Sequence, residues 1–197
     1  RPIFKVIMKR LFSVLILGSA LLVFGFCKKT KDQVNEATEF TIDYSTTLPV
    51  PSSSISANVP VEFTTPDIPT TSTTRFASEK TTKELIDEIK LTKFNISTST
   101  GNLDFLKSIS ISIQASGLPG MAVASKTPIP TGQTTISADL SDVNIKDYIF
   151  KDNIQFKVSV TINTALGSDK ELKLEQSIKV KGKKLINPDN FLISCSL

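Results

Sequence analysis

Apolar side chains recur at every second position along most of this chain, and this alternation limits the folds that it can adopt. It is clearest where polar residues separate Ile154, Phe156, Val158, Val160 and Ile162. Successive side chains of a β-strand point to opposite faces of its sheet, so a period of two predicts a strand with one buried and one solvated face. We therefore expect antiparallel sheets rather than packed helices.

Other segments repeat this alternation between clusters of Gly, Pro and Asn, which are typical of turns. The segments that we predict to be strands are 40–44, 55–63, 92–96, 105–115, 121–125, 136–140, 154–162, 172–180 and 191–197. Pro60 should place its strand at a sheet edge or a bulge. The apolar positions change parity near Lys90, which predicts a bulge or a helix-to-strand junction there. Across the loop 166–169, the strands 154–162 and 172–180 are expected to pair as a hairpin.

Two segments have helical character instead. Thr81 and Glu84 match a capping box, which predicts a helix of two to three turns beginning there. Residues 141–150 place apolar side chains at helical spacing and predict a single turn. We expect both to carry the chain from one sheet to the other.

Short antiparallel strands with frequent turns predict an all-β fold, an antiparallel β-sandwich that is Ig-like or jelly-roll-like, with one or two short helices at the sheet corners. We assign residues 38–197 to this domain and the polar residues 28–37 to a tether. Residues 66–78 are rich in Thr and lack apolar periodicity, so they are the candidate for an internal linker.

Residues 1–27 differ from the rest of the chain. Met8, Lys9 and Arg10 precede the apolar run 11–26, which ends at Cys27 and a group of lysines. This run is shorter than the roughly 20 residues that a membrane-spanning helix needs. A basic start, an apolar centre and an abrupt polar end are typical of an export signal.

Residues 8–31 resemble the signal sequence of a bacterial lipoprotein, and most closely those of Bacteroidota surface lipoproteins, in which a lysine-rich stretch follows the cysteine. The resemblance implies that Cys27 is lipidated, becomes the mature N-terminus and anchors the protein at the outer membrane or cell surface. Phe26 stands where the family has a small residue. An uncleaved helical anchor and secretion without an anchor therefore stay open, and all three alternatives export the domain.

The charge distribution argues against nucleic acid as a partner. The net charge is +4, but four of the 23 basic residues lie within residues 1–27, which contain no acidic residue, so 19 remain against 19 acidic ones. Nucleic-acid binding requires clustered positive charge, whereas these lysines alternate with acidic and hydroxyl residues.

The chain contains no histidine, and this limits its chemistry. Ser-His-Asp and Cys-His catalysis and His-ligated zinc all require imidazole. We therefore predict neither an enzyme nor a cofactor. If Cys27 carries lipid, Cys195 has no partner for an intramolecular disulfide, and its alternating segment predicts a buried apolar role.

Three groups of polar residues are candidates for binding. Oxygen ligands, which calcium prefers, gather near the 141–150 turn, but their spacing lacks the EF-hand order, and helix capping and strand polarity account for them without a metal. The calcium candidates are Asp139, Asp142, Asn144, Asp147 and Asp152. Two predicted strands have polar faces, which could form either an adhesive surface or an ordinary solvated sheet face. These faces carry Ser108, Ser110, Ser112 and Gln114 on one strand and Gln155, Lys157, Ser159 and Thr161 on the other. Gln176 lies on the apolar side of its strand, which predicts a rim position or a bulge.

These observations favour an exported, membrane-tethered lipoprotein with a non-enzymatic binding or accessory role at the cell envelope. Its expected partners are the membrane, through lipid at Cys27, and an envelope protein or glycan. The alternative is an adhesin-like or fimbria-like subunit that assembles by strand exchange through residues 191–197. A more remote alternative is a hydrolase that uses the carboxylates of Asp139 or Asp142.

Overall fold

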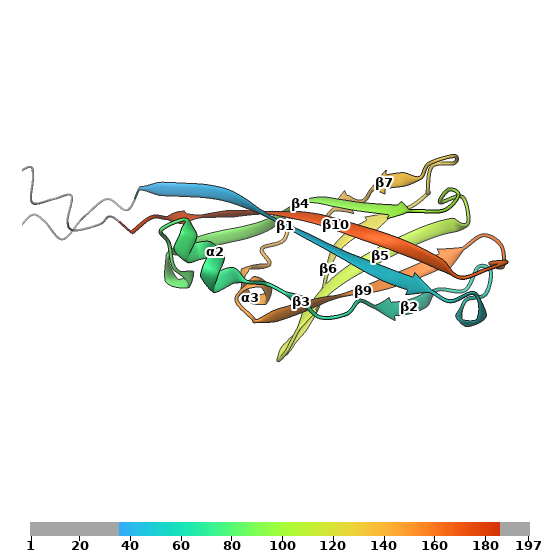
Figure 1. The fold of residues 1–197 in the computed structure, drawn as a ribbon, viewed down its shortest axis with the longest axis horizontal. Helices are drawn as coiled ribbons and strands as arrows, with labels where there is room; N and C mark the ends of the chain where they lie inside the picture. Colours follow the sequence, from blue (N-terminus) through green and yellow to red (C-terminus); the bar gives the residue numbers. More distant parts are fainter. Residues whose placement is uncertain (1–35, 186–197) are drawn as a thin grey trace, which may run out of the picture. The chain divides into compact units, whose positions relative to one another are not determined.

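The computed structural model describes residues 36–185, which fold into two antiparallel β-sheets packed face to face (Figure 1). In the four-stranded sheet the order is β1 (Ala37–Val50), β10 (Lys170–Lys183), β4 (Ile86–Thr98) and β7 (Thr135–Ser137). In the six-stranded sheet the order is β2 (Val61–Thr64), β9 (Asn153–Ile162), β5 (Leu106–Ala115), β6 (Leu118–Lys126) and β8 (Asp139–Leu140). The two-residue strand β3 (Ile68–Pro69) pairs with the beginning of β9.

The strand order is that of a jelly roll. Without the two-residue strands β3 and β8, the remaining strands read first, eighth, third and sixth along one sheet and second, seventh, fourth and fifth along the other. Two interlocked Greek keys produce this order. The predicted all-β sandwich is therefore confirmed, and the strand order selects the jelly-roll alternative over the Ig-like one.

The core lies between the sheets and is built from the alternating positions that define the strands. Every second residue of β9 from Ile154 to Ile162 is buried, as the alternation predicts. Phe94 of β4 meets Phe156 of β9 edge to face across the core, with ring centroids 5.3 Å apart. Such contacts between the two sheets bury the apolar side of each one.

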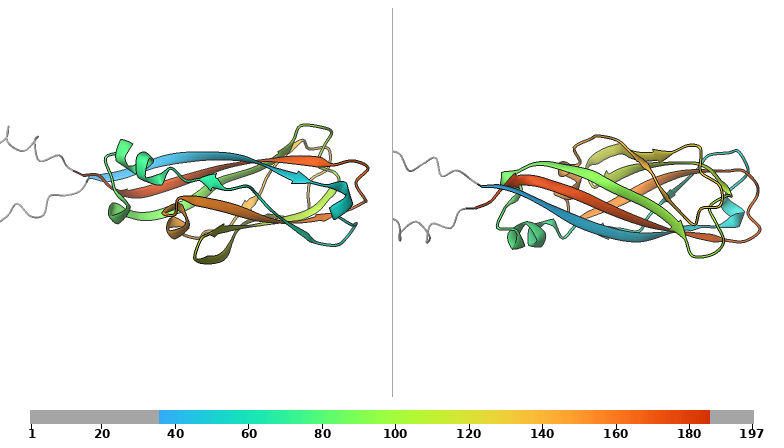
Figure 2. Two further views of the ribbon diagram at one scale, coloured as in Figure 1. Left: turned by 60° about the horizontal axis from the view of Figure 1, so that its bottom comes forward. Right: turned by 90° about the horizontal axis from the view of Figure 1, so that it is seen from above.

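The predicted hairpin between residues 154–162 and 172–180 is wrong. β10 pairs with β1 along its whole length and with β4 on its other side, whereas β9 lies in the opposite sheet (Figure 2). The loop after β9 thus carries the chain across the core. Alternation indicates which side of a strand is buried, but it does not indicate which strand lies beside it. β9 and β10 bury their apolar sides in the same core from opposite sheets.

Residues 66–78 are part of the domain rather than a linker. They contain β3 and the helix α2 (Ser72–Ser78). Phe76 of α2 is 1% exposed and packs edge to face against Phe40 and Phe150, at 6.1 and 6.0 Å. Thr70 is also buried, and its hydroxyl donates to the Lys151 carbonyl oxygen at 2.6 Å. The segment is held by one buried aromatic side chain and by hydrogen bonds. Because these contacts do not require apolar residues at regular intervals, the sequence of the segment resembles a linker.

The predicted helix after Thr81 is also wrong. Only a 3₁₀ turn, η2 (Lys83–Leu85), forms there, and β4 begins at Ile86. The Thr81 hydroxyl donates to the Lys183 carbonyl oxygen at 2.6 Å, so it ties this segment to the end of β10 instead of capping a helix. Pairing of residues 86–98 with β10 outweighs the local helical preference.

Several smaller predictions are confirmed. The helix α3 (Lys146–Ile149) forms in the 141–150 segment. The strand after Pro60, β2, lies at a sheet edge, although only residues 61–64 of the predicted 55–63 segment are in it, and a 3₁₀ turn, η1 (Ser52–Ser54), precedes it. The expected bulge of β4 lies at Thr92, two residues from Lys90.

The predictions for the export signal of residues 1–27 with Cys27, for the tether 28–37 up to residue 35, for Cys195 and for the strand 191–197 fall outside the described residues. Among residues 36–185, no helix has the length and apolar character needed to cross a membrane.

Candidate functional site

The residues proposed for calcium do not come together. Asp139 pairs with Lys126 at 2.9 Å, and Asp142 pairs with Lys90 at 2.7 Å. The Asn144 side-chain oxygen instead accepts from the backbone N–H of Ile89, at 3.0 Å. Asp147 is exposed on α3, and Asp152 lies beyond it near the start of β9. Within residues 36–185, no three potential ligands gather as a metal site. Lysines hold Asp139 and Asp142, and a backbone amide holds Asn144.

The outer face of the four-stranded sheet is covered by ion pairs. Lys179 lies 2.8 Å from Glu39, whose pKa is lowered mainly by the hydrogen bond from that lysine. The hydrogen bonds to Asp142 and Glu88 raise the pKa of Lys90 to about 12. These pairs are solvated, so they contribute little to stability, and they keep this face highly polar.

The outer face of the six-stranded sheet is rich in hydroxyl and amide groups. The two predicted polar faces do pair, because β5 and β9 are neighbours in this sheet. Their outward residues lie opposite each other as Ser108–Thr161, Ser110–Ser159, Ser112–Lys157 and Gln114–Gln155. This polar row ends at a pocket near the β5–β6 hairpin.

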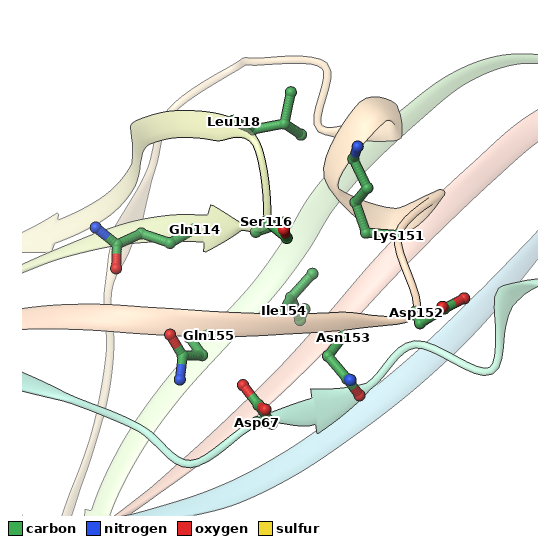
Figure 3. A pocket seen from close by; sticks show the side chains of 10 residues that line it. Asp67, Gln114, Ser116, Leu118, Lys151, Asp152, Asn153, Ile154 and Gln155 are labelled. Carbon is green, nitrogen blue, oxygen red and sulfur yellow. The ribbon is translucent and has the colours of Figure 1, made fainter.

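The pocket has a volume of about 660 Å³ and is the candidate functional site (Figure 3). β9 runs through its floor, with β3 on one side and β5 on the other. Its lining residues are Asp67, Gln114, Ala115, Ser116, Leu118, Lys151, Asp152, Asn153, Ile154 and Gln155.

Three of these polar residues form a row: Gln114 on β5, Gln155 on β9 and Asp67, which immediately precedes β3. Gln155 lies opposite Gln114 of β5. On the other side of β9, Ile68 lies opposite Ile154 in an antiparallel pair. The residue before Ile68, Asp67, is therefore level with the residue after Ile154, Gln155. In Figure 3 the Gln155 side chain extends from β9 on the side where Asp67 lies. Because neighbouring strands are about 4.8 Å apart, the row presents polar groups at a spacing that one small molecule can bridge.

The polar side chains of the pocket are free to bind a ligand. The hydrogen bonds and ion pairs among residues 36–185 involve none of the lining side chains, whereas nearby Lys157 is held by Glu62 at 2.6 Å. The hairpin turn beside the pocket depends on Gly117, whose φ of +76° favours glycine. Gly120 leaves room for the Gln114 side chain. A Cβ added at Gly120 would lie 3.4 Å from the Gln114 amide nitrogen.

Sequence reasoning found part of this site. It placed Gln114 and Gln155 on paired polar faces, and the alternation was the signal. It named Asp152 only as a calcium candidate, and it missed Asn153 and Asp67. Asp67 reaches the pocket only through β3, which lies in the segment predicted to be a linker. No local pattern marks a two-residue strand.

Gln176 is a buried polar residue of the core, so its predicted rim position is wrong. A bulge, the other alternative, does lie beside it, because the register with β4 shifts between Ser177 and Ile178. The Gln176 side chain is 1% exposed, and neither amide atom has a hydrogen-bond partner among residues 36–185. Its register neighbours are Tyr44 on β1 and Phe94 on β4. The Tyr44 hydroxyl donates to the Thr70 carbonyl oxygen at 2.9 Å, and burial raises the pKa of Tyr44 to about 12.

The fold and the pocket define this protein as a jelly-roll domain with a polar cleft at one end of its six-stranded sheet. No family model and no curated protein matches the chain.

Solved structures with some similarity include a chain from the infectious bursal disease virus Gt strain, with a TM-score of 0.34 and 12% identity over 75% of this chain. This chain spans only 32% of the length of that viral chain. Another is a mud crab tombus-like virus structure, with a TM-score of 0.35 and 9% identity, covering 82% of this chain and 87% of the viral one. The jelly-roll assignment rests on the strand order and not on these similarities.

Proposed function

We propose that this chain is an exported lipoprotein, anchored through Cys27 at the outer membrane or cell surface, whose jelly-roll domain binds a partner and catalyses no reaction. The lipoprotein-like signal at residues 8–31 is the observation that carries the location. The domain begins with β1 at Ala37, so the polar residues 28–36 are available as a tether between the anchor and the domain.

A binding role is supported by the chemistry of the pocket. Four of the seven polar side chains in the lining are amides or a hydroxyl, which hold a ligand through hydrogen bonds, and the chain has no histidine to act as the base for a nucleophile. Elsewhere in the described domain, Asp139 and Asp142 are engaged with lysines, which argues against their use in hydrolysis.

The anchor can be tested by lipid labelling in a bacterial host that processes lipoproteins. Cells producing the full chain are fed an alkyne-tagged fatty acid, and the protein is recovered from membrane and soluble fractions. We expect label on the native chain and none on Cys27→Ser, which should leave the membrane. Cys195→Ser is the matched control and should keep both the label and the membrane location.

The other outcomes separate the three alternatives. A Cys27→Ser protein that stays in the membrane while the native chain is unlabelled would indicate an uncleaved helical anchor. An unlabelled native chain in the medium would indicate secretion without an anchor. Either result would overturn lipidation at Cys27.

One structural observation favours strand exchange as a second candidate. β1 is 14 residues long and lies at the edge of its sheet, where β10 is its only pairing partner among the described strands. A long edge strand can accept a strand from another copy. Deleting residues 191–197 should abolish concentration-dependent oligomers in analytical ultracentrifugation if this candidate is correct. A native chain that stays monomeric at high concentration would refute it.

A further inference from the structure

We propose that the pocket between β3, β9 and the β5–β6 hairpin binds a neutral sugar residue through Asp67, Gln114 and Gln155. This inference rests on the proposed binding function and deepens it, because it names the ligand class and the site. The pocket volume of about 660 Å³ lies within the range of small-molecule sites, about 300–1,000 Å³, and fits one or two sugar rings.

The hydrogen-bonding character of the row matches hydroxyl groups. Each glutamine amide offers two N–H donors and an acceptor oxygen, and an ionised carboxylate accepts only. A hydroxyl donates one hydrogen bond and accepts others, so adjacent ring hydroxyls can bind an amide and a carboxylate together. Asn153 and Ser116 add groups of the same kind at the two sides of the pocket.

The charge of the lining favours a neutral ligand over an anionic one. The lining contains two carboxylates, those of Asp67 and Asp152, and one ammonium group, that of Lys151. The pocket therefore carries a net negative charge, which repels phosphates and uronic acids.

The position of the pocket favours a sugar over an extended peptide. Peptides that join sheets use the free backbone groups of an edge strand. Here the floor is β9, whose backbone is paired on both sides, with β3 and β5. Recognition must come from side chains that rise from the sheet face, and these are hydroxyl-binding groups.

The apolar part of the lining is small. Ala115 and Leu118 can cover the C–H face of one ring, but no aromatic side chain lines this pocket. Stacking on an aromatic ring buries much of a ligand's surface, and this pocket lacks that contribution. We therefore expect low affinity, with a Kd of about 0.1 to 10 mM. The hydroxyl row that continues along β5 and β9, from Ser112 toward Thr161, offers further contacts for a chain of sugars.

The test uses the full chain purified in detergent and four neutral probes: maltotetraose, cellotetraose, xylotetraose and mannotetraose. Ligand-observed NMR detects weak binding, and a titration provides the Kd. We expect at least one probe to bind, and Gln155→Leu and Asp67→Asn to weaken that binding by about tenfold or more. The first change removes an amide from the row, and the second replaces one acceptor oxygen of the carboxylate by an NH2 donor. Polygalacturonate, an anionic probe, should not compete.

Gln133→Leu is the matched control, because Gln133 is exposed outside the lining and should leave the Kd unchanged. Circular dichroism of each variant checks that the fold is retained. If Gln155→Leu does not fold, Gln114→Glu, which keeps the shape but removes the amide donors, should weaken binding in its place.

The proposal is overturned if none of the four probes binds, if polygalacturonate displaces the bound probe, or if Asp67→Asn and Gln155→Leu bind as the native chain does. Lipid labelling at Cys27 in the same preparation distinguishes failure of this site from failure of the proposed function. Chromatography of the probe after incubation adds a further check. Cleavage lost in Asp67→Asn would support the site but contradict a purely binding role.

Discussion

Replacing Gln176 with methionine should stabilise the domain. The Gln176 amide lies in the core with neither of its polar atoms hydrogen-bonded among residues 36–185. Methionine has nearly the same length and flexibility, so it can occupy the same space between Tyr44 and Phe94 without a polar group.

The magnitude follows from the desolvation of the amide. Burial of an unpaired amide costs about 1–3 kcal/mol by mutational data, and its removal should return a similar amount. For a domain of this size, each kcal/mol corresponds to about 2–4 °C in Tm. We therefore expect the free energy of unfolding of Gln176→Met to rise by about 1–3 kcal/mol and its Tm by about 2–12 °C.

The assay is urea denaturation followed by far-ultraviolet circular dichroism, because the chain contains no tryptophan for fluorescence. The midpoint should rise while the slope of free energy against urea stays unchanged. Gln133→Met makes the same chemical change at an exposed position and should alter the free energy by no more than about 0.5 kcal/mol.

A loss of more than about 1 kcal/mol in Gln176→Met would refute this reasoning. Such a loss would mean that the amide is hydrogen-bonded in the folded protein, since removal of a satisfied amide leaves its partner unpaired.

Three further predictions follow from the backbone and from Tyr44. Gly182→Ala should lower the free energy of unfolding by about 1–3 kcal/mol in the same urea assay, because its Cβ would clash with the Leu85 carbonyl oxygen, and an unchanged midpoint would refute this close approach. Thr71→Gly should raise it by about 1 kcal/mol, because Thr71 has a φ of +48°, which strains a β-branched residue, and a lower midpoint would contradict that strain. The pKa of Tyr44 is raised to about 12, so the folded state holds the hydroxyl proton more tightly than the unfolded state does. The free energy of unfolding should therefore fall by about 1–3 kcal/mol as the pH rises from about 10 to 12. Tyr44→Phe also loses the hydrogen bond to Thr70 and should be less stable than the native chain at pH 9, with the difference narrowing at pH 11, whereas a constant difference would refute the raised pKa.

The sequence alone predicted the fold class and most of the strands. The alternation of β9 and the inward positions of β5 needed no tertiary information, because a period of two is a local property of a strand with one buried face. Gln114 and Gln155 pair once these strands are neighbours, so two of the three residues of the pocket row were visible in the sequence as part of a polar face.

Only the tertiary structure decided which strands are neighbours and what completes the pocket. β9 and β10 have the same alternation and a turn between them, yet they lie in opposite sheets, where β10 pairs with β1 and β4 and β9 pairs with β2, β3 and β5. At Thr81 the predicted helix does not form, and the segment is held instead by the pairing of β4 with β10 and by the Thr81 hydrogen bond to Lys183. Asp67 is brought to the pocket by the pairing of Ile68 with Ile154. Alternation records burial one residue at a time, whereas strand order depends on the free energy of contacts between residues far apart in the chain.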